Sequence, residues 1–530
     1  MTVGEDINAP AGEGRTEFYT STIRALAMEN DILRKENRAL RMELESYRER
    51  VDDMDSEGRS KDETIRSLQE ENRSCVHKLT MNSRNSSLPP SMDRMWRARP
   101  RSLRVPTGLK PGAQKGHKGV APEIPHEPDE IVEHLPQVCL DCPRLAECSG
   151  NGLFQCSGRR YVVEAVTTTR VVEHRTMRAS CPHGDPSMNG TAVMGSFPEG
   201  VSAHVQYGDS FKIIVGLLDC IGAVGDKRIS DLVDSFFDVK LSPGTVVKMT
   251  RECSEVVDPA VERIRTMITE SPVVNFDESG ANVQGENAWI HTASTTLLTH
   301  LHLSRFRGEY GAREGGVIQF FKGTAVHDCF RSYWRFDNIG KHAVCGAHLL
   351  RELTAIEDTV PEHTWARTMR EFLLAVKSMR DEAASRGLKS LSEARLDGLS
   401  KRYDEILDIA DMQCPRPRTP RKVGSGRNAL GKERALLERL RNLKSEVMLH
   451  AYDFQVPFDN NQAERDIRFN KTKIKVSGCF RTRSGAAQYL KLTSYLSTCR
   501  KNGIGPYEGL TMAFEGRPFI PRLSESDRLL

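Results

Sequence analysis

Apolar residues recur in a repeat of seven over residues 23–54, at the two positions that form the core of a coiled coil. The first core position holds Ile23, Asn30, Asn37, Leu44 and Val51, and the second holds Leu26, Leu33, Leu40, Tyr47 and Met54. The two asparagines lower stability, but in a parallel dimer they pair and specify register and strand number. The alternative is a single amphipathic helix that packs on its own protein. We therefore predict a coiled-coil dimerisation segment over 18–80.

The hydrophobic pattern becomes that of β-strands after residue 271. Three β-rich runs, "PVVNFDESG", "NAWIHTAST" and "TLLTHLHLS", follow one another with short turns, which predicts an antiparallel meander. A later apolar run, "GGVIQFFKGTAVHDCF", ends just after Asp328. Residues 361–450 have the pattern of charged helices instead. We expect a multidomain α+β protein whose core spans 270–360 and 451–515, interrupted by a helical insertion over 361–450.

The apolar spacing is helical between residues 207 and 253. "KRISDLVDSFFDV" predicts one amphipathic helix, and "LSPGTVVKMTREC" begins another, with Ser242 as N-cap and Pro243 at the first helical position. Two short helices joined by a tight turn are typical of a helix-turn-helix, which we place at 203–256. An ordinary helical hairpin has the same pattern. The residues expected to face a DNA groove are Thr245, Lys248 and Arg251.

Composition and charge add a basic linker to this picture. The chain has 530 residues, enough for about three or four domains, and its formal net charge of +4 hides local clusters. The segment 81–128 is rich in Ser, Pro and Gly, and between Arg94 and Lys118 it contains eight Lys or Arg and no acid. Such a linker neutralises phosphates without reading sequence, although a merely solvated tether has the same charge.

Two negative features bear on the compartment. The first twenty residues lack the apolar run of a signal peptide, so we expect the thirteen cysteines to be reduced, in the cytoplasm. No stretch of about 18 uninterrupted apolar residues exists, so no membrane span is expected.

Short cysteine pairs indicate a candidate zinc-ribbon-like module over 129–190. The candidate ligands are Cys139 and Cys142 in "CLDC", and Cys181 and His183 in "CPHG". Two ligand pairs flanking strands such as "RRYVVEAVTTTRVVEH" suit tetrahedral Zn²⁺, which replaces a core too small to form alone. Cys148 or Cys156 can substitute in the second pair, and unligated thiols are the alternative. A second group, His342, Cys345 and His348, has helical spacing. Three interpretations are open for it: metal binding, packing near an active site, or orientation of a phosphate.

Three carboxylates are the candidates for catalysis. Asp277 and Asp328 each end a strand pattern, and Glu464 lies on a predicted helix behind the turn "VPFDNN". If folding brings them together, they repel one another but form a good oxygen cage for Mg²⁺ or Mn²⁺. Two such ions activate a nucleophile and stabilise the leaving oxygen in phosphodiester chemistry. Metal-assisted phosphoryl transfer is therefore the expected reaction.

A basic surface accompanies the third carboxylate. From Glu464 to Arg483 there are seven Lys or Arg against two acids. The candidate phosphate contacts are Arg465, Arg468, Lys471, Lys473, Lys475, Arg481 and Arg483. The segment therefore suits a DNA backbone, although a solvated ion-pair helix has the same composition.

These residues carry a family resemblance. "VPFDNNQAERDIRFNKTKIKVSGCFRTRSGA", with "HAVCGAHLLREL" upstream, closely resembles the catalytic region of insertion sequence 66 family transposases. "NSSLPPSMD", "KPGAQKGHKG" and the cysteine pairs resemble the N-terminal half of that family, so the likeness covers roughly 20–515. The family implies a DDE transposase with a ribonuclease-H-like catalytic fold, in which Asp277, Asp328 and Glu464 are the three acids. His327, Cys329 and the Cys181 to His183 pair depart from the family pattern.

The resemblance implies a function and partners. We expect a transposase that binds the ends of its mobile element, hydrolyses the phosphodiester at each end and joins the freed 3′-hydroxyl to target DNA. Mg²⁺ (or Mn²⁺) and double-stranded DNA are implied, with Zn²⁺ at the cysteine pairs. The coiled coil implies a homodimer or higher oligomer, and accessory proteins of the element are an open question. The rivals are a catalytically inactive DNA-binding remnant and a structure-selective nuclease of the same fold.

Overall fold

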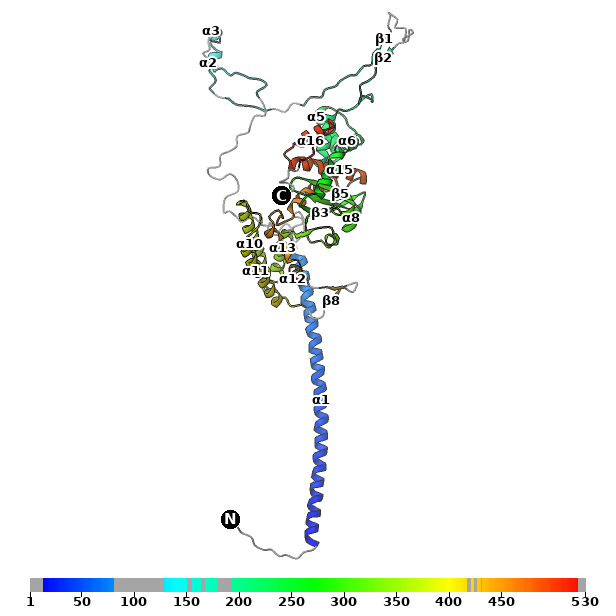
Figure 1. Ribbon diagram of the computed structural model, residues 1–530, viewed down its shortest axis with the longest axis vertical. Helices are drawn as coiled ribbons and strands as arrows, with labels where there is room; N and C mark the ends of the chain where they lie inside the picture. The colour runs from blue at the N-terminus through cyan, green and yellow to red at the C-terminus, as the bar shows by residue number, and fades with distance from the viewer. Residues whose placement is uncertain are drawn as a thin grey trace. The chain divides into compact units, whose positions relative to one another are not determined.

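The computed structural model describes residues 13–80, 127–149, 155–157, 159–163, 167–179, 193–416, 421–423, 427–429 and 431–522. The chain divides into two compact units. One comprises Met1–Met95, Glu352–Thr368 and Asp408–Leu437; the other comprises Trp96–Arg351, Met369–Leu407 and Glu438–Leu530. The protein is multidomain α+β, as expected, with a mixed five-stranded sheet among many helices (Figure 1). Nearly all of the expected basic linker lies outside the described residues.

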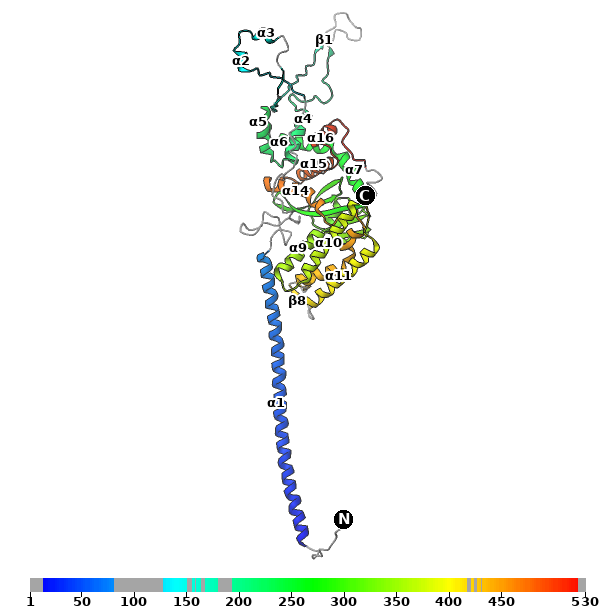
Figure 2. The same cartoon turned by 90° about the vertical axis from the view of Figure 1, so that its left-hand side faces the viewer.

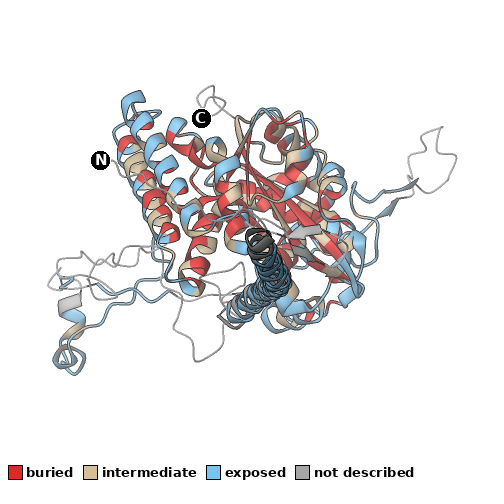
Figure 3. Ribbon diagram, turned by 90° about the horizontal axis from the view of Figure 1, so that it is seen from below, coloured by how far each residue is buried: buried red, intermediate tan, exposed pale blue. Residues whose placement is uncertain are grey.

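The N-terminal segment is one uninterrupted helix, α1 (Glu13–Thr80), which continues through Gly58. Every side chain that the structure describes on α1 is exposed, including the apolar core positions of the heptads (Figure 3). Leu33 is 48% exposed and Leu40 is 62% exposed. An isolated apolar stripe of this kind loses stability in water unless a second helix covers it. The helix is therefore as predicted, and its partner stays a prediction.

The central sheet contains strands in the order β5-β4-β3-β6-β7. The five strands are β3 (Val273–Val283), β4 (Glu286–Ser294), β5 (Thr299–Ser304), β6 (Thr324–His327) and β7 (Lys341–Val344). β3, β4 and β5 form the predicted antiparallel meander. β6 then pairs in parallel with β3, and β7 pairs in parallel with β6. The longest strand, β3, therefore lies at the centre with an antiparallel and a parallel neighbour.

A two-residue turn fixes the register of the first hairpin. Gln284 and Gly285 both have positive φ, 57° and 83°, and they connect the paired residues Val283 and Glu286. Positive φ at both central residues defines the turn whose twist matches that of antiparallel strands, and Gly adopts it without steric cost. The hairpin register in turn decides which face of the sheet each residue of β3 occupies.

Four helices directly precede the sheet along the chain, and four more lie in the C-terminal part of the chain. They are α4 (Asp209–Cys220), α5 (Asp226–Phe237), α6 (Pro243–Val256) and α7 (Asp258–Thr269), then α13 (Lys444–Tyr452), α14 (Asn461–Ser477), α15 (Arg483–Lys501) and α16 (Pro506–Phe514). α14 packs on β3 and β4, α15 on β5, and α13 on β7. Figure 2 labels α14 and α15 beside the green strands of the sheet. The shared core joins apolar residues of the sheet, such as Ile290, to Ile264 of α7 and Tyr495 of α15.

Helices α4, α5 and α6 contact one another around a small core of their own, which includes Val215, Ile229 and Val246. Ser242 is the N-cap of α6, as predicted: its Oγ accepts a hydrogen bond from Thr245 N at 3.1 Å, and Pro243 is the first helical residue. The cap satisfies a backbone N–H that has no partner inside the helix.

The chain between β5 and α13 is largely helical where it is described. It contains α8 (Glu309–Glu314), a 3₁₀ helix (Arg331–Arg335), α9 (Gly346–Thr359), α10 (Trp365–Ser385), α11 (Glu393–Gln413) and α12 (Lys432–Asn442), with a short hairpin of β8 (Arg421–Val423) and β9 (Arg427–Ala429). None of the helices that the structure describes is long and apolar enough to span a membrane.

The strands expected over 159–174 are wrong for the described part of that run. Residues 159–163 and 167–174 belong to no strand, and their valines are exposed, such as Val162 at 85%. The described elements nearby are α2 (Gln137–Leu140), α3 (Leu145–Ser149), and the two-residue strands β1 (Arg178–Ala179) and β2 (Val193–Met194). An alternating pattern stabilises a strand only when the side chains on one face are buried, and these valines are exposed.

Candidate active site

The two candidate aspartates lie side by side on adjacent parallel strands. β3 and β6 pair with Asn275 opposite Val326, and extending this register by two residues places Asp277 level with Asp328. Asp277 lies within β3, and Asp328 is the first residue after β6. Both side chains are half-buried. Parallel pairing therefore brings together two carboxylates that are far apart in sequence.

Glu464 reaches the same place through the N-terminus of α14. Asn460, the residue before that helix, donates a hydrogen bond from Nδ2 to the carbonyl of Phe276 at 2.7 Å. Phe276 directly precedes Asp277 in β3. Glu464 lies in the first turn of α14, so this bond fixes the helix start beside the strand that carries the first aspartate. The turn "VPFDNN" thus attaches the third carboxylate to the sheet.

The electrostatics of Asp277 depend on the other two carboxylates. Burial is the largest cause that raises the pKa of Asp277 to about 7; the hydrogen bond from Glu278 N and the charge of Lys471 oppose the shift, and the negative charges of Asp328 and Glu464 add to it. Glu464 Oε1 is buried and accepts no hydrogen bond from the residues that the structure describes. Buried carboxylate oxygens that repel one another are the donor set that a hard divalent cation binds. The residues present therefore fit Mg²⁺ or Mn²⁺.

An arginine and a histidine flank Glu464. Arg351 NH2 lies 3.6 Å and His348 Nδ1 lies 3.8 Å from Glu464 Oε1. Both come from α9, in the run "HAVCGAHLLREL". Cys345, just before that helix, brings its sulfur within 4.8 Å of the ligand atoms of His348 and Glu464. Sequence spacing grouped Cys345 and His348 with His342, but the structure places Glu464, not His342, beside them.

His342 lies in β7 instead and contacts His327, next to the turn that follows Asp328. Its Nδ1 lies 3.0 Å from His327 Nε2, and His327 Nδ1 accepts a hydrogen bond from Cys329 N at 3.1 Å. Cys329 has φ of +71°, a conformation that is strained for a residue with a side chain. Burial lowers the pKa of His327 to about 3, with a smaller effect from His342, so the ring is neutral. In a neutral imidazole only one nitrogen carries a proton. Because Nδ1 of His327 accepts a hydrogen bond, its proton is on Nε2, which donates a hydrogen bond to His342 Nδ1.

The basic residues of α14 and the following segment are exposed, with one exception. The exposed ones are Arg465, Arg468, Lys471, Lys475, Arg481 and Arg483. Lys473 is 7% exposed, and its ammonium group donates to Asp219 at 2.5 Å and to the carbonyl of Val224 at 2.6 Å. A buried lysine bonded in this way cannot meet a phosphate, so including Lys473 in the phosphate-binding set was wrong. It joins α14 to α4 instead.

The other candidate sites are described in part. On α6, Lys248 and Arg251 are exposed, and Thr245 is half-buried beside the cap. Lys248 and Arg251 pair loosely with glutamates one turn on, at 3.8 and 3.5 Å. Cys139 and Cys142 flank a tight turn in which Cys142 N donates to the Cys139 carbonyl at 3.2 Å. The other two candidate zinc ligands, Cys181 and His183, lie outside the described residues.

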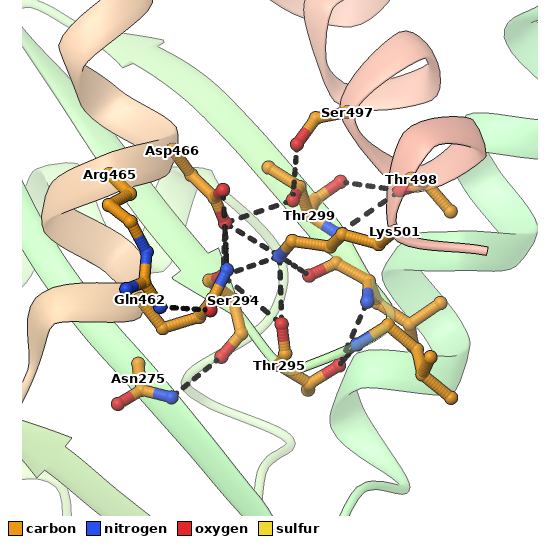
Figure 4. Close-up of polar contacts among 12 residues, drawn as sticks. Asn275, Ser294, Thr295, Thr299, Gln462, Arg465, Asp466, Ser497, Thr498 and Lys501 are labelled. Carbon is orange, nitrogen blue, oxygen red and sulfur yellow. Dashed lines mark hydrogen bonds and ion pairs between the residues drawn. The ribbon is translucent and has the colours of Figure 1, made fainter. Parts of the chain in front are cut away.

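A buried ion pair behind α14 was not predicted. Lys501 of α15 donates to Asp466 Oδ2 at 2.6 Å, to Ser294 Oγ at 2.9 Å and to two backbone carbonyls (Figure 4). Thr299 Oγ1 donates to the same carboxylate oxygen at 3.0 Å. Asp466 is two residues from Glu464 and thus on the opposite face of α14. No sequence spacing identifies Lys501, because the pair joins segments that meet only in the folded chain.

The chain is similar to known proteins over two of its segments. Residues 25–123 match a family of unknown function, DUF6444. Residues 215–488, more than half of the chain, match the family described as Transposase IS66 family. The chain is also 26% identical over 191 residues to the uncharacterized protein y4jO of Sinorhizobium fredii, which covers 34% of this chain and 51% of that protein. The chain thus spans about half the length of that curated relative. On the breadth of the family match, the chain belongs to the Transposase IS66 family.

Proposed function

We propose that this protein is the DNA transposase of an insertion sequence, which cleaves the phosphodiester bond at each end of the element and joins the freed 3′-hydroxyl to target DNA. The observation that carries the proposal is the parallel pairing of β3 with β6, which sets Asp277 level with Asp328, together with the hydrogen bond that attaches the start of the Glu464 helix to β3. The raised pKa of Asp277 supports it, because two acids from other segments, Asp328 and Glu464, contribute to the shift. Family membership supplies DNA as the substrate class.

The three carboxylates would hold Mg²⁺ or Mn²⁺, which supplies activation of the attacking oxygen and stabilisation of the leaving oxygen. The protein's own contribution is geometry. β3 and β6 fix the two aspartates, and the Asn460 to Phe276 hydrogen bond fixes the start of the helix that carries Glu464. Rigid placement of the acids removes the entropic cost of assembling them around the scissile phosphate.

We also propose that the catalytic domain is ribonuclease-H-like. Its support is the strand order, in which a three-stranded antiparallel meander continues through parallel pairing of its first strand with β6 and of β6 with β7. The two candidate aspartates lie where β3 and β6 pair. The helices α10, α11, α12 and most of α13 form the proposed insertion over 361–450, between the segments that carry the second and third acids.

DNA contacts are proposed on two surfaces. Beside the acids, the exposed basic residues of α14 and the segment after it face phosphates: Arg465, Arg468, Lys471, Lys475, Arg481 and Arg483. Lys471 lies near enough to act on Asp277 electrostatically, so it would contact phosphate next to the reacting bond. On α6, Thr245, Lys248 and Arg251 are the proposed groove contacts of a helix-turn-helix. The zinc module and the linker would add contacts outside the catalytic domain.

The coiled-coil prediction adds a reason for pairing. Two α1 helices side by side would cover the exposed apolar stripe and bring two catalytic domains into one assembly. A reaction that joins both ends of one element requires two active sites on two DNA ends, which a dimer supplies.

The test replaces Glu464 by glutamine, which keeps the shape of the side chain and removes its charge. Purified protein is incubated with Mg²⁺ and a plasmid that carries the gene with its flanking DNA. We expect Glu464→Gln to abolish end cleavage while DNA binding in a gel-shift assay is unchanged. Glu515→Gln, an exposed glutamate paired with Arg517, is the matched control and should cleave normally. Loss of binding and cleavage together would contradict the assigned role.

Strand-transfer products distinguish the rivals. A transposase yields joined molecules from the plasmid assay, a structure-selective nuclease yields only cut DNA, and a binding remnant yields neither. The intact carboxylates at all three positions favour a competent enzyme.

A further inference from the structure

The cluster that contains Glu464 also offers a sulfur and a nitrogen ligand, which Mg²⁺ does not prefer. Cys345 lies between β7 and α9, His348 is in the first turn of α9, and Glu464 is in the first turn of α14. One ligand atom from each lies within 4.8 Å of the other two. A thiol, an imidazole and a carboxylate are the three side-chain types that bind zinc, whereas a hard cation prefers oxygen alone.

We propose that Cys345, His348 and Glu464 form a binding site for one borderline divalent cation of the Zn²⁺ class, and that its occupation inhibits the enzyme. Zn²⁺ would hold Glu464 through one oxygen and withdraw it from the group formed with Asp277 and Asp328. The inhibitory half rests on the proposed function, because it needs Glu464 to be the third acid. The binding half does not.

The distances suit a small ion. His348 Nδ1 and Glu464 Oε1 are 3.8 Å apart, and two ligands of a tetrahedral zinc with bonds of about 2.0–2.2 Å are separated by about 3.4 Å. Cys345 Sγ lies within 4.8 Å of both atoms, so it needs to approach by at most about an ångström to reach the separation of zinc ligands. Three protein ligands leave a fourth position for water or a phosphate oxygen, as in open zinc sites.

Burial raises the pKa of the Cys345 thiol to about 12, so the thiolate depends on the metal itself, and two local features favour the bound form. Cys345 Sγ accepts a hydrogen bond from Asn460 N at 3.1 Å, an outer contact of the kind that stabilises a metal ligand. The sulfur and Glu464 also lie at the N-termini of α9 and α14, where partial positive charge favours anions. Glu464 Oε1 has no hydrogen bond from the described residues that a metal would have to replace.

One contact opposes the cation. Arg351 NH2 lies 3.6 Å from Glu464 Oε1, so a bound ion would push the guanidinium away or toward the other carboxylate oxygen. The side chain of Arg351 is 26% exposed, which leaves it a path toward solvent. Asp459 contributes negative charge close to Cys345 and partly offsets the arginine.

Binding is measured with Co²⁺ on the reduced, metal-free full chain. Cobalt bound to a thiolate gives a ligand-to-metal charge-transfer band that oxygen-bound cobalt lacks. Cys139 and Cys142 are replaced by serine in every sample, so that cobalt at that pair does not contribute. We expect one equivalent of Co²⁺ with this band, loss of the band in Cys345→Ser, and binding at least about tenfold weaker in His348→Ala. Cys479→Ser removes an exposed thiol and should change nothing.

The same variants separate binding from folding. His348→Ala keeps the thiol, so a weaker band in a variant whose circular dichroism matches the parent reports the lost ligand. An unchanged cobalt spectrum in both Cys345→Ser and His348→Ala would overturn the site. We expect Zn²⁺ to displace the cobalt and millimolar Mg²⁺ not to displace it. Displacement of the cobalt by Mg²⁺ would also overturn the proposed site.

Inhibition is measured on the plasmid substrate with Mg²⁺ held constant and Zn²⁺ added. We expect stoichiometric Zn²⁺ to stop cleavage by the parent, and His348→Ala to require at least about tenfold more Zn²⁺ for the same inhibition. Equal sensitivity of the two proteins would overturn the inhibitory half. If the parent does not cleave without Zn²⁺, the proposed function fails, while the cobalt spectrum still decides the site.

Discussion

His327 Nε2 lies 3.0 Å from His342 Nδ1, while the opposite nitrogen of His327 accepts the backbone N–H of Cys329. The imidazole therefore links β7 to the strained residue that follows Asp328. Tyr333 stacks on the His327 ring at 4.8 Å between centroids, and Trp334 stacks on His342 at 4.4 Å. His327 and Cys329 are the residues that depart from the family pattern recognised in the sequence, and the His327 to His342 contact holds the turn that orients the second acid.

Replacing His327 should therefore affect catalysis. His327→Ala removes the acceptor for Cys329 N, and we expect kcat for Mg²⁺-dependent cleavage to fall about tenfold to a hundredfold, because small displacements of a catalytic group are costly. His327→Asn places an amide oxygen near the position of Nδ1 and should recover most of the activity. His327→Gln places its oxygen nearer the position of Nε2 and should not. Equal activity of the Asn and Gln variants would show that the acceptor position is unimportant.

The ion pair of Lys501 with Asp466 should stabilise the fold strongly. Both side chains are about nine-tenths buried, and Lys501→Met leaves the carboxylate without its cation. We expect a loss of about 3–5 kcal/mol in the free energy of unfolding, measured by urea denaturation. Activity should fall as well, because Asp466 anchors the face of α14 opposite Glu464.

The matched control is on the same helix. Lys491 of α15 pairs with Asp258, but these side chains are 35% and 60% exposed. Lys491→Met should therefore cost less than about 1 kcal/mol. Similar losses for Lys491→Met and Lys501→Met would contradict the anchoring role. Combining Lys501→Met with Asp466→Leu should recover stability, because the uncompensated buried charge is then removed.

Removing one of the three mutually repelling acids should stabilise the metal-free protein. Burial and the charges of Asp328 and Glu464 disfavour the ionised form of Asp277 and raise its pKa. Asp277→Asn removes that charge, so we expect a higher melting temperature in EDTA. Mg²⁺ should raise the melting temperature of the parent by binding the folded state, and it should not do so for the variant. Asp337→Asn, at an exposed site, should respond to Mg²⁺ like the parent.

Two lysines two positions apart on α14 should respond oppositely to substitution. Lys471 is exposed and close to Asp277, so Lys471→Ala should reduce the slope of log K for duplex binding against log salt by about one. Lys473 is buried against Asp219, so Lys473→Met should lower stability and leave the salt slope unchanged. A reduced slope for Lys473→Met would return Lys473 to the phosphate-binding set.

The heptad prediction is tested by introducing one glutamate at either a core position or an outer position of α1. Leu40 occupies a core position and Met42 an outer position, and both are exposed in the single chain, at 62% and 73%. Leu40→Glu should convert a dimer to a monomer in sedimentation equilibrium, because a buried carboxylate is strongly disfavoured. Met42→Glu adds the same charge on the outer face and should leave the dimer intact. Monomeric parent protein would contradict the coiled coil.

The sequence by itself determined the features that depend on local periodicity. The heptads predicted α1, alternation predicted the meander, and the Ser242 to Pro243 pair predicted the start of α6; the structure confirms all three. Each depends on side chains a few residues apart, so the chain's own spacing fixes the outcome. The prediction of strands over 159–174 was wrong for the described residues, because an alternating pattern forms a strand only where one face is buried.

Only the tertiary structure decided which distant groups meet. The sequence pattern and the family resemblance selected Asp277, Asp328 and Glu464, but the effect of the other two acids on Asp277 depends on parallel pairing of β3 with β6 and on the start of α14. The burial of Lys473, the Lys501 to Asp466 pair and the His327 to His342 contact have no periodic signal. They join segments far apart in sequence, and long-range contacts arise from the packing of whole elements and not from the spacing within any one of them.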